Sequence, residues 1–243
     1  MRAELSKLLG LPTAWVGLAL GLVAAPALVF VNTPGLRRAL ESERIADLGY
    51  ENLGIGLLGA LILGVVAVSS EYTSTGDDSP GAHQMTATLL AMPRRSRLLV
   101  AKGVALSLVV AVQGTLTASA TMVLTQVMLP DYAPPFAPAR IAAAVLYWTL
   151  LGLLAFATTL IFRNGIITLT VFIVNSSVVS VSYLLTKLTP WAAYLPDIVG
   201  AHMFLRSMPG ETHIPPVTAG LVMTAWVAAF LVAAGFFFTR RSA

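Results

Sequence analysis

Residues 71–102, EYTSTGDDSPGAHQMTATLLAMPRRSRLLVAK, separate two apolar runs that are each long enough to cross a bilayer. The stretch is polar over most of its length, and basic residues gather at its end: Arg94, Arg95, Arg97 and Lys102. Lysine and arginine beside membrane spans are enriched on the cytoplasmic side. We therefore expect this stretch to form the cytoplasmic working end of a polytopic membrane protein.

The composition of the whole chain supports a membrane protein. Hydrophobic residues make up 57% of the sequence and charged residues 11%, and the mean hydropathy is +0.82. A soluble domain usually carries about 25% charged residues. The absence of cysteine excludes disulfides, thiolate metal ligands and cysteine nucleophiles. The net charge of +4 does not predict a nucleic-acid partner, because the basic residues lie at the ends of apolar runs.

Six apolar runs predict an all-α membrane protein with a single transmembrane domain over residues 1–243. Each run has about the length that a membrane-spanning helix needs. The expected crossings are residues 11–31, 53–69, 98–129, 141–162, 166–185 and 217–238. Residues 1–10 form a short amphipathic segment, the mixed charges of residues 32–52 suit a short surface helix, and the aromatic and proline-rich residues 186–216 predict short interfacial helices.

Counting basic residues predicts that both termini are cytoplasmic. With the termini, the 71–102 stretch and the joint at Arg163 inside, the inner side holds nine Lys and Arg: Arg2, Lys7, Arg94, Arg95, Arg97, Lys102, Arg163, Arg240 and Arg241. The outer side holds six: Arg37, Arg38, Arg44, Arg140, Lys187 and Arg206. The excess on the inner side follows the positive-inside rule.

Polar side chains follow one face of the third crossing at steps of four residues. They are Gln113, Thr117, Thr121 and Thr125, and Asn175 adds an amide to the fifth crossing. Helix packing is the favoured interpretation, because hydroxyls in membranes usually bond a backbone or a neighbouring helix. The alternative is that Gln113, Thr117, Thr121 and Asn175 line a translocation pathway. Gly17 and Gly21 form a GxxxG pair, which permits close helix approach but also arises often by chance.

Motifs for catalysis and for ATP hydrolysis are missing from the sequence. It contains no GxxxxGK[ST] phosphate loop and no GxSxG nucleophile elbow. The histidines, at 83, 202 and 213, lack metal-ligand spacing, and His83 beside Asp77 and Asp78 is better explained as part of a solvated loop. No ionisable residue lies in the middle of a crossing, which disfavours an ion-coupled carrier. We therefore expect no enzyme, no bound metal or cofactor, and an energy source outside this chain.

The centre of the 71–102 stretch contains a candidate docking helix. Residues 82–91, AHQMTATLLA, follow a turn at Pro80 and Gly81 and end before Pro93, which cannot continue a helix. Such a helix suits a groove on a cytoplasmic protein. It equally suits a position on anionic headgroups, with the arginines as anchors. These two interpretations remain open on the residues alone.

The order of residues in this stretch resembles the segment between the second and third crossings of ABC-2 type permeases, the membrane subunits of one class of ATP-binding-cassette transporters. The similarity is closest to the short actinobacterial type. It rests on Ser70, Glu71, Tyr72, Gly76, Thr86, Thr88, Leu89, Leu90, Pro93, Arg94, Arg95, Arg97, Leu98, Ala101 and Lys102. The segment DDSPGAHQM makes the approach to the Thr86 region longer than the family pattern.

The resemblance implies that residues 82–91 are a coupling helix that docks on a separate ATPase subunit. The implied contact residues are Glu71, Thr86, Thr88, Leu89, Leu90, Arg94 and Arg95. ATP and Mg would be bound by that partner. A second permease copy or a related permease would complete the pathway in the cell membrane.

The expected function is ATP-driven export of a hydrophobic or amphipathic substrate, with an antibiotic or peptide favoured, including self-immunity. The alternative is a membrane sensor or assembly factor that docks a cytoplasmic regulatory protein without transport. Dependence on an ATPase partner distinguishes the two. An intramembrane enzyme is disfavoured by the missing catalytic residues.

Overall fold

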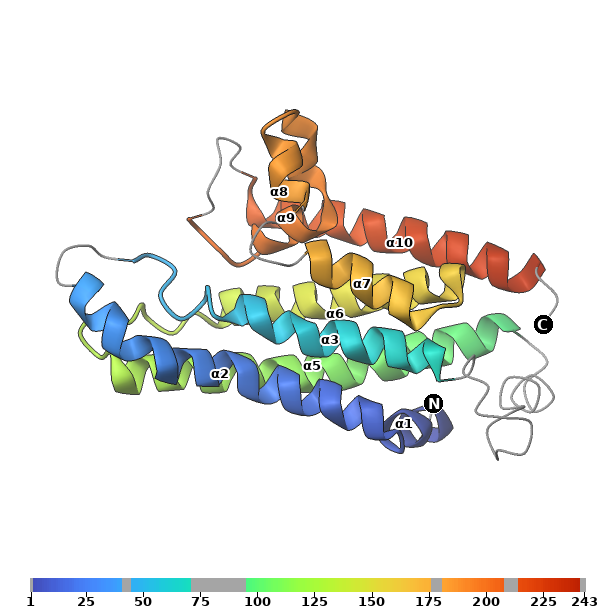
Figure 1. Cartoon of the computed structure of the whole chain (residues 1–243), viewed down its shortest axis with the longest axis horizontal. Coiled ribbons are helices and arrows are strands. Elements are labelled where there is room, and N and C mark those ends of the chain that lie inside the picture. The colour runs from blue at the N-terminus through green and yellow to red at the C-terminus, as the bar shows by residue number, and fades with distance from the viewer. Residues whose placement is uncertain (1, 41–44, 71–94, 176–180, 208–213, 241–243) are drawn as a thin grey trace.

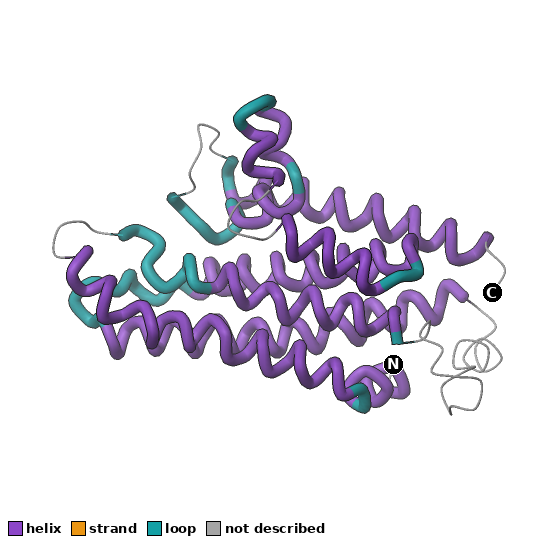
Figure 2. Tube along the Cα trace, viewed as in Figure 1, coloured by secondary structure: helices purple, strands orange, loops and turns teal. Residues whose placement is uncertain are grey.

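The computed structural model describes residues 2–40, 45–70, 95–175, 181–207 and 214–240, and in these residues every regular element is helical (Figures 1 and 2). Six of the predicted ATPase-contact residues lie outside the described residues: Glu71, Thr86, Thr88, Leu89, Leu90 and Arg94. The helices are α1 (Arg2–Leu9), α2 (Pro12–Leu40), α3 (Leu53–Ser69), α5 (Arg95–Met128), α6 (Pro138–Phe162), α7 (Gly165–Asn175), α8 (Val181–Thr186), the 3-10 helix η1 (Pro190–Tyr194), α9 (Pro196–Ala201) and α10 (Pro216–Arg240).

Four of these helices are long and apolar enough to cross a membrane by length and composition. Their spans are Pro12–Arg37, Arg97–Met128, Pro138–Phe162 and Pro216–Phe238. At most of their boundaries, these four spans agree with the first, third, fourth and sixth predicted crossings to within a few residues. α3 has the bounds of the second predicted crossing, and its 17 residues are at the lower end of the length range for a membrane span.

α3 lies at the centre of the bundle, in contact with α2, α5, α6 and α7 (Figure 1). Most of its side chains are buried, including Leu61 and Leu63, because apolar residues surround the helix on all sides rather than forming one stripe. From α6, Trp148 fills the space beside it, where a Cβ atom on Gly56 would lie 2.4 Å from the indole ring. The core of the molecule is therefore built around the shortest of the five helices that run along the bundle.

Glycine contacts set the distance between α3 and its neighbours. A Cβ atom on Gly59 would lie 2.6 Å from the Cα of Gly21 and 2.7 Å from the carbonyl oxygen of Gly17. On the other side, a Cβ atom on Gly64 would lie 2.3 Å from the carbonyl oxygen of Gly152. Small residues let helix backbones approach closely in membranes. The GxxxG pair of α2 is thus a packing surface for α3.

α2 extends well beyond the predicted first crossing and includes the beginning of the predicted surface helix. It continues as one helix to Leu40, through Pro34. Near its end, Arg37 donates a hydrogen bond of 2.9 Å to the carbonyl oxygen of Met128 at the C-terminus of α5. A cation at a helix C-terminus satisfies a free carbonyl and interacts favourably with the helix dipole. This contact connects the charged end of α2 to the end of α5.

The predicted fifth crossing is represented by two short helices. α7 ends at Asn175 and α8 spans Val181–Thr186, and residues 176–180 lie outside the described part of the chain. The following segment contains η1 and α9, as the aromatic and proline-rich sequence predicts for short helices. In Figure 1, α8 and α9 lie to one side of the long helices, above α7 and beside α10.

The ends of the described chain lie at the same end of the bundle (Figure 1). α1 and the C-terminus of α10 are both found there, as are the last residue of α3 and the first residue of α5. The turn between α6 and α7 is also at this end, because a Cβ atom on Gly165 would lie 2.9 Å from the Cβ of Ser69. We call this the terminal end of the bundle, and the other the distal end.

Candidate functional site

The helices on either side of the predicted coupling loop both have their adjoining ends at the terminal end of the bundle. α3 ends at Ser69 and α5 begins at Arg95, so the predicted coupling loop, 70–97, connects two helices whose ends are both here. Of the predicted contact residues, Arg95 is the first residue of α5. The others lie outside the described residues, so the coupling helix remains a prediction.

A buried ion pair fastens α1 to α5 beside this segment. Lys102 Nζ lies 2.9 Å from Glu4 Oε2, and the two residues are only 8% and 7% exposed. Lys7, one turn further along α1, lies 3.7 Å from the other oxygen of Glu4. A buried charge is tolerated only when it is paired and hydrogen-bonded. Glu4 therefore holds the N-terminal helix against the first turns of α5.

α1 also presents an apolar contact to the bundle. Leu8 is 5% exposed, whereas Leu9 next to it is 39% exposed, as expected for an amphipathic helix with one side on protein. After the helix, the indole nitrogen of Trp15 donates a hydrogen bond of 2.8 Å to the carbonyl oxygen of Leu9. This bond fixes the corner between α1 and α2.

Gln113 lies where α2, α3 and α5 meet. Its Nε2 atom donates to the carbonyl oxygens of Gly17 at 3.0 Å and Leu18 at 3.1 Å, and its side chain is buried. A Cβ atom on Gly59 of α3 would come within 2.9 Å of the same nitrogen. The amide therefore occupies the space that the glycines leave open.

The threonines of the same face continue this polar line toward the distal end. The Thr117 hydroxyl lies 2.9 Å from the carbonyl oxygens of both Gly21 and Gln113. Thr121 and Thr125 donate to carbonyl oxygens one turn earlier in α5, and all three threonines are at most 1% exposed. In the single chain, these residues lie in the interface of α5 with its neighbours. This is the arrangement that the packing interpretation expects.

Asn175 is separate from this polar line. It is the last residue of α7, and its Oδ1 atom accepts hydrogen bonds from the backbone nitrogen and the hydroxyl of Ser182, at 3.2 Å and 3.1 Å. The amide therefore connects α7 to α8. The structure brings Gln113, Thr117 and Thr121 together on one helix face and leaves Asn175 in a different contact.

A second buried charged cluster, not identified from the sequence, lies toward the distal end. Asp47 pairs with the guanidinium of Arg140 at the start of α6. Its second oxygen accepts from the backbone nitrogens of Arg206, at 2.9 Å, and Ser207, at 2.6 Å. The Nε atom of Arg140 donates to the carbonyl oxygen of Phe204 at 2.9 Å. One carboxylate thus joins the α2–α3 connection, α6 and the segment after α9.

Aromatic and acidic groups complete the Asp47–Arg140 cluster. The guanidinium carbon of Arg140 lies 3.6 Å from the ring centroid of the fully buried Tyr50, a cation–π contact. Partial desolvation, with a further contribution from the Asp47 carboxylate, raises the pKa of Glu51 above its usual 4.5. The cluster therefore joins separate segments of the chain. Folding favours the protonated form of the Glu51 carboxyl group beside it.

The described residues offer no arrangement for metal binding. Nowhere in this part of the chain do three or more His, Asp or Glu residues approach closely enough to hold an ion. His202 instead directs its Nδ1 atom at the carbonyl oxygen of Ile198, 3.0 Å away in α9. The buried ion pairs Glu4–Lys102 and Asp47–Arg140 each join separate segments of the chain.

These features define a class: an all-helical protein with four helices of membrane-spanning length and composition, whose buried charges lie toward the ends of the helices. Comparison with known proteins identifies no relative, because no protein-family model, no curated protein and no solved structure matches the chain.

Proposed function

We propose that the chain is the membrane-spanning permease subunit of an ATP-driven exporter, of the ABC-2 type that the 71–102 stretch resembles. One observation carries the proposal: this stretch connects α3 to α5, and the joined ends of these helices lie at the terminal end of the bundle, where α1 and the C-terminus of α10 also lie. A cytoplasmic ATPase docked there would act on two helices and, through the Glu4–Lys102 pair, on α1.

In this proposal the chain crosses the cell membrane six times, with the terminal end in the cytoplasm. α3 and the α7–α8 region supply the two crossings beyond the four long helices. Both termini lie at one end of the bundle, as an even number of crossings requires. The arginine-rich start of α5 is at that end too, in the position that the positive-inside rule favours.

The proposed substrate is hydrophobic or amphipathic, with an antibiotic or peptide favoured. A second permease copy or a related permease would complete the pathway, because in the described bundle the polar face of α5 is occupied by contacts with its own helices. ATP and Mg would be bound by the partner ATPase. Nucleotide-driven closure of two ATPase subunits would switch the permeases between two states by rigid-body movement.

Partner identification tests the proposal most directly. The tagged chain is purified from its native membrane in mild detergent, and co-purifying proteins are identified by mass spectrometry. We expect a nucleotide-binding ATPase in near-equal amount. A chain that purifies alone, or with a kinase or a lipid-synthesis enzyme, would contradict the transporter and favour the sensor or assembly factor.

A docking variant tests the location of the contact. Replacing Leu89 and Leu90 with aspartate should abolish recovery of the ATPase, because charged side chains cannot enter an apolar groove without a large desolvation cost. A control variant between α8 and η1, Leu188→Asp, changes a leucine that is 82% exposed and should leave recovery unchanged. Undiminished recovery with the double variant would refute the placement of the docking helix at residues 82–91.

A further inference from the structure

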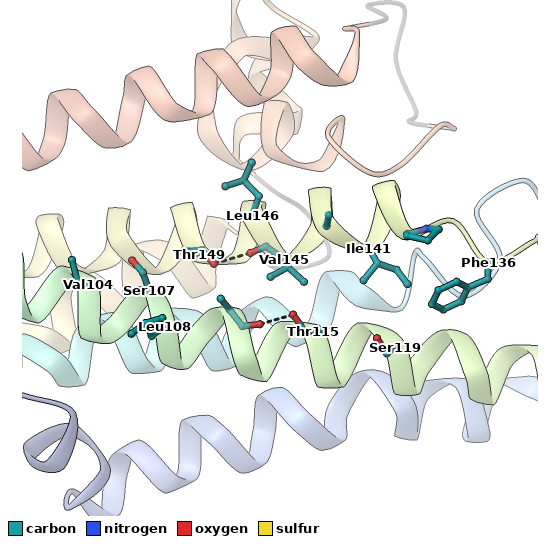
Figure 3. A pocket seen from close by; sticks show the side chains of 13 residues that line it. Val104, Ser107, Leu108, Thr115, Ser119, Phe136, Ile141, Val145, Leu146 and Thr149 are labelled. Atoms are coloured by element: carbon teal, nitrogen blue, oxygen red, sulfur yellow. Dashed lines mark hydrogen bonds between the residues drawn. The ribbon is translucent and has the colours of Figure 1, made fainter. Parts of the chain in front are cut away.

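Two hollows follow one another along the surface of α5. The larger, of about 720 Å³, lies between α5 and α6, and its lining includes Leu108, Phe136, Ile141 and Val145 (Figure 3). The smaller, of about 390 Å³, lies between α5, α6 and α10, and its lining includes Val100, Leu153 and Leu231. Val104 and Ser107 line both hollows. The two hollows are therefore adjacent, and we call them together the α5–α6–α10 groove.

The wall of the groove is apolar despite its hydroxyl-bearing residues. The hydroxyls of Ser107, Thr115 and Thr149 each donate a hydrogen bond of 2.8 Å to a carbonyl oxygen one turn earlier in the same helix. Figure 3 shows two of these bonds as dashed lines. With their donors occupied, these side chains contribute little polarity to the groove. The groove therefore suits a hydrocarbon occupant.

The groove has the length of a membrane interior. Along α5 its lining runs from Leu99 to Ser119, which corresponds to about 30 Å of helix at 1.5 Å per residue. The hydrocarbon core of a bilayer is also about 30 Å thick. All of this lining lies inside the candidate span Arg97–Met128, and Val104 and Leu108 are exposed. In a membrane, the groove opens to the acyl chains.

A positive charge lies at the terminal end of the groove. Arg97 is three residues before Val100, so the two side chains share a face of α5, and Arg97 is exposed. It is also the first residue of the candidate span, where the headgroup region begins. The neighbouring cation, Lys102, is instead paired with Glu4 on another side of the helix. The groove thus combines an apolar channel with a cation at the headgroup level.

We propose that the α5–α6–α10 groove binds an anionic phospholipid of the leaflet at the terminal end. One acyl chain lies in the smaller hollow and continues toward Val104 and Ser107, and the phosphate pairs with Arg97. Charge complementarity favours this occupant over a zwitterionic lipid, because the ammonium of a zwitterionic headgroup offsets its phosphate, whereas an anionic headgroup brings a net negative charge to Arg97. The proposal does not depend on an ATPase partner.

Native mass spectrometry of the full-length chain in mild detergent tests this site. The protein is incubated with equal amounts of phosphatidylglycerol and phosphatidylethanolamine that carry identical acyl chains. Phosphatidylglycerol should be retained about fivefold more, the effect expected for one basic residue near a membrane surface. Arg97→Gln should remove that preference. Its control is Arg240→Gln, because Arg240 stacks on Phe236, 4.1 Å from the ring centroid, and lies nine residues after Leu231, on the opposite side of α10.

A filling variant tests the apolar part of the site separately. A Cβ atom on Gly103 would make only an ordinary 3.7 Å contact with Leu153, so Gly103→Leu should fold and occupy the smaller hollow. We expect it to reduce retention of both lipids. Unchanged lipid retention in Arg97→Gln and Gly103→Leu would overturn the proposal. Efficient disulfide cross-linking of two copies carrying Ser107→Cys, in a chain that has no other cysteine, would assign the groove to a dimer and would also overturn it.

Discussion

Arg140 is the residue on which most of the contacts of the Asp47–Arg140 cluster converge. Its guanidinium pairs with Asp47 and stacks on Tyr50, both in the α2–α3 connection, and its Nε atom donates to the carbonyl oxygen of Phe204 in the segment after α9. Buried ion pairs contribute little when compared with a well-packed apolar replacement, but removing one partner leaves an unpaired buried charge. The cluster should therefore respond very differently to single and paired substitutions.

The first prediction concerns this asymmetry. Arg140→Met should lower the free energy of unfolding by about 3–5 kcal/mol, because Asp47 stays buried without its cation. Adding Asp47→Asn to that variant should recover part of the loss. Thermal unfolding of the detergent-purified protein measures both variants and the single variant Asp47→Asn. If the double variant is as unstable as the sum of the two single variants, the two side chains act independently and the ion pair is not the important contact.

A second prediction concerns Glu51 and pH. Its pKa in the folded protein is raised above 4.5, so the folded state binds the proton more tightly than the unfolded state. Its contribution to stability is therefore greatest at low pH and is lost as the pH rises from 4.5 through the raised pKa. Glu51→Gln should remove this contribution to the pH dependence and be slightly more stable than the parent at neutral pH. Thermal unfolding midpoints of the parent and of Glu51→Gln, measured from pH 4 to 8, would show this difference in pH dependence. Parallel curves of midpoint against pH for the two proteins would contradict the prediction.

Single residues also show what the sequence can and cannot predict. The four-residue spacing of Gln113, Thr117, Thr121 and Thr125 predicts a shared helix face and favours packing as the use of that face. The partners of Gln113 and Thr117 in α2 lie 95 or 96 residues away. Asp47 and Arg140 are similarly separated, by 93 residues, and neither has a distinctive local pattern. Pairings of this kind depend on how helices assemble, which one sequence does not encode locally.

At the scale of elements, α3 owes its central position to glycine. The close approach of Gly59 to Gly17 and Gly21 leaves no room for a side chain between α2 and α3. Gly54, in the first turn of the same helix, is different, because a Cβ atom added there would meet nothing within 4 Å among the described residues. The two positions therefore form a matched pair for testing the helix contact.

The third prediction uses that pair. Gly59→Ala should destabilise the protein by about 1–3 kcal/mol, because an added methyl group must separate two backbones. Gly54→Ala should be neutral or stabilising, since alanine is the better helix former. Thermal unfolding in detergent compares them directly. Equal effects of the two substitutions would show that helix propensity, and not close packing, determines the result.

The fourth prediction concerns the attachment of α1. Glu4→Gln removes the charge that pairs with Lys102, so α1 should separate from α5 more often. The chain has no cysteine, which allows a single introduced thiol to report on this movement. Leu8→Cys, at a 5% exposed position, should react with a maleimide several times faster in the Glu4→Gln background.

Leu9→Cys is the control for this measurement, because Leu9 is 39% exposed and should react rapidly in both backgrounds. If the Leu8→Cys rate is unchanged by Glu4→Gln, the apolar contacts of α1 hold it in place without the ion pair.

Helix boundaries show where sequence patterns are weaker guides. Charge marks the end of the apolar run near Val31, yet α2 continues to Leu40, because a helix can leave the membrane while its polar residues find partners such as the Met128 carbonyl. The run at 166–185 predicts one helix, and in the described residues α7 spans Gly165–Asn175 and α8 spans Val181–Thr186. Hydropathy reports the environment of a segment and does not mark the residue at which a helix ends.

For the whole molecule, the fifth prediction is that α1 and the end of α10 lie on one side of the membrane and the α5–α6 connection on the other. Arg2→Cys and Arg240→Cys, both exposed, should react with a membrane-impermeant maleimide only from the cytoplasmic side. Tyr132→Cys, in the connection, should react only from the opposite side. Labelling of intact cells and of inverted vesicles distinguishes the two faces. Labelling of Arg2→Cys and Arg240→Cys from different sides would exclude an even number of crossings.

The overall class of the protein follows from composition and run length, because both report directly on the solvent around the helices. The four longest runs correspond to the four helices that can span a membrane. The Glu4–Lys102 pair and the α5–α6–α10 groove arise only after those helices pack, so no local pattern predicts them. The function expected from the 71–102 stretch rests on a resemblance in sequence and stays a proposal.

The contacts of Asp47 impose an order on biosynthesis. Its partners at Arg140, Arg206 and Ser207 follow it by 93, 159 and 160 residues, so the ribosome makes this carboxylate long before its protein partners. Until then the newly made α2 and α3 carry an acidic group without those partners at the distal end. A chain that stops before Arg206 keeps part of that defect permanently. We expect such truncated chains to be recognised and degraded by membrane proteases, which makes this joint a checkpoint for completion of the protein.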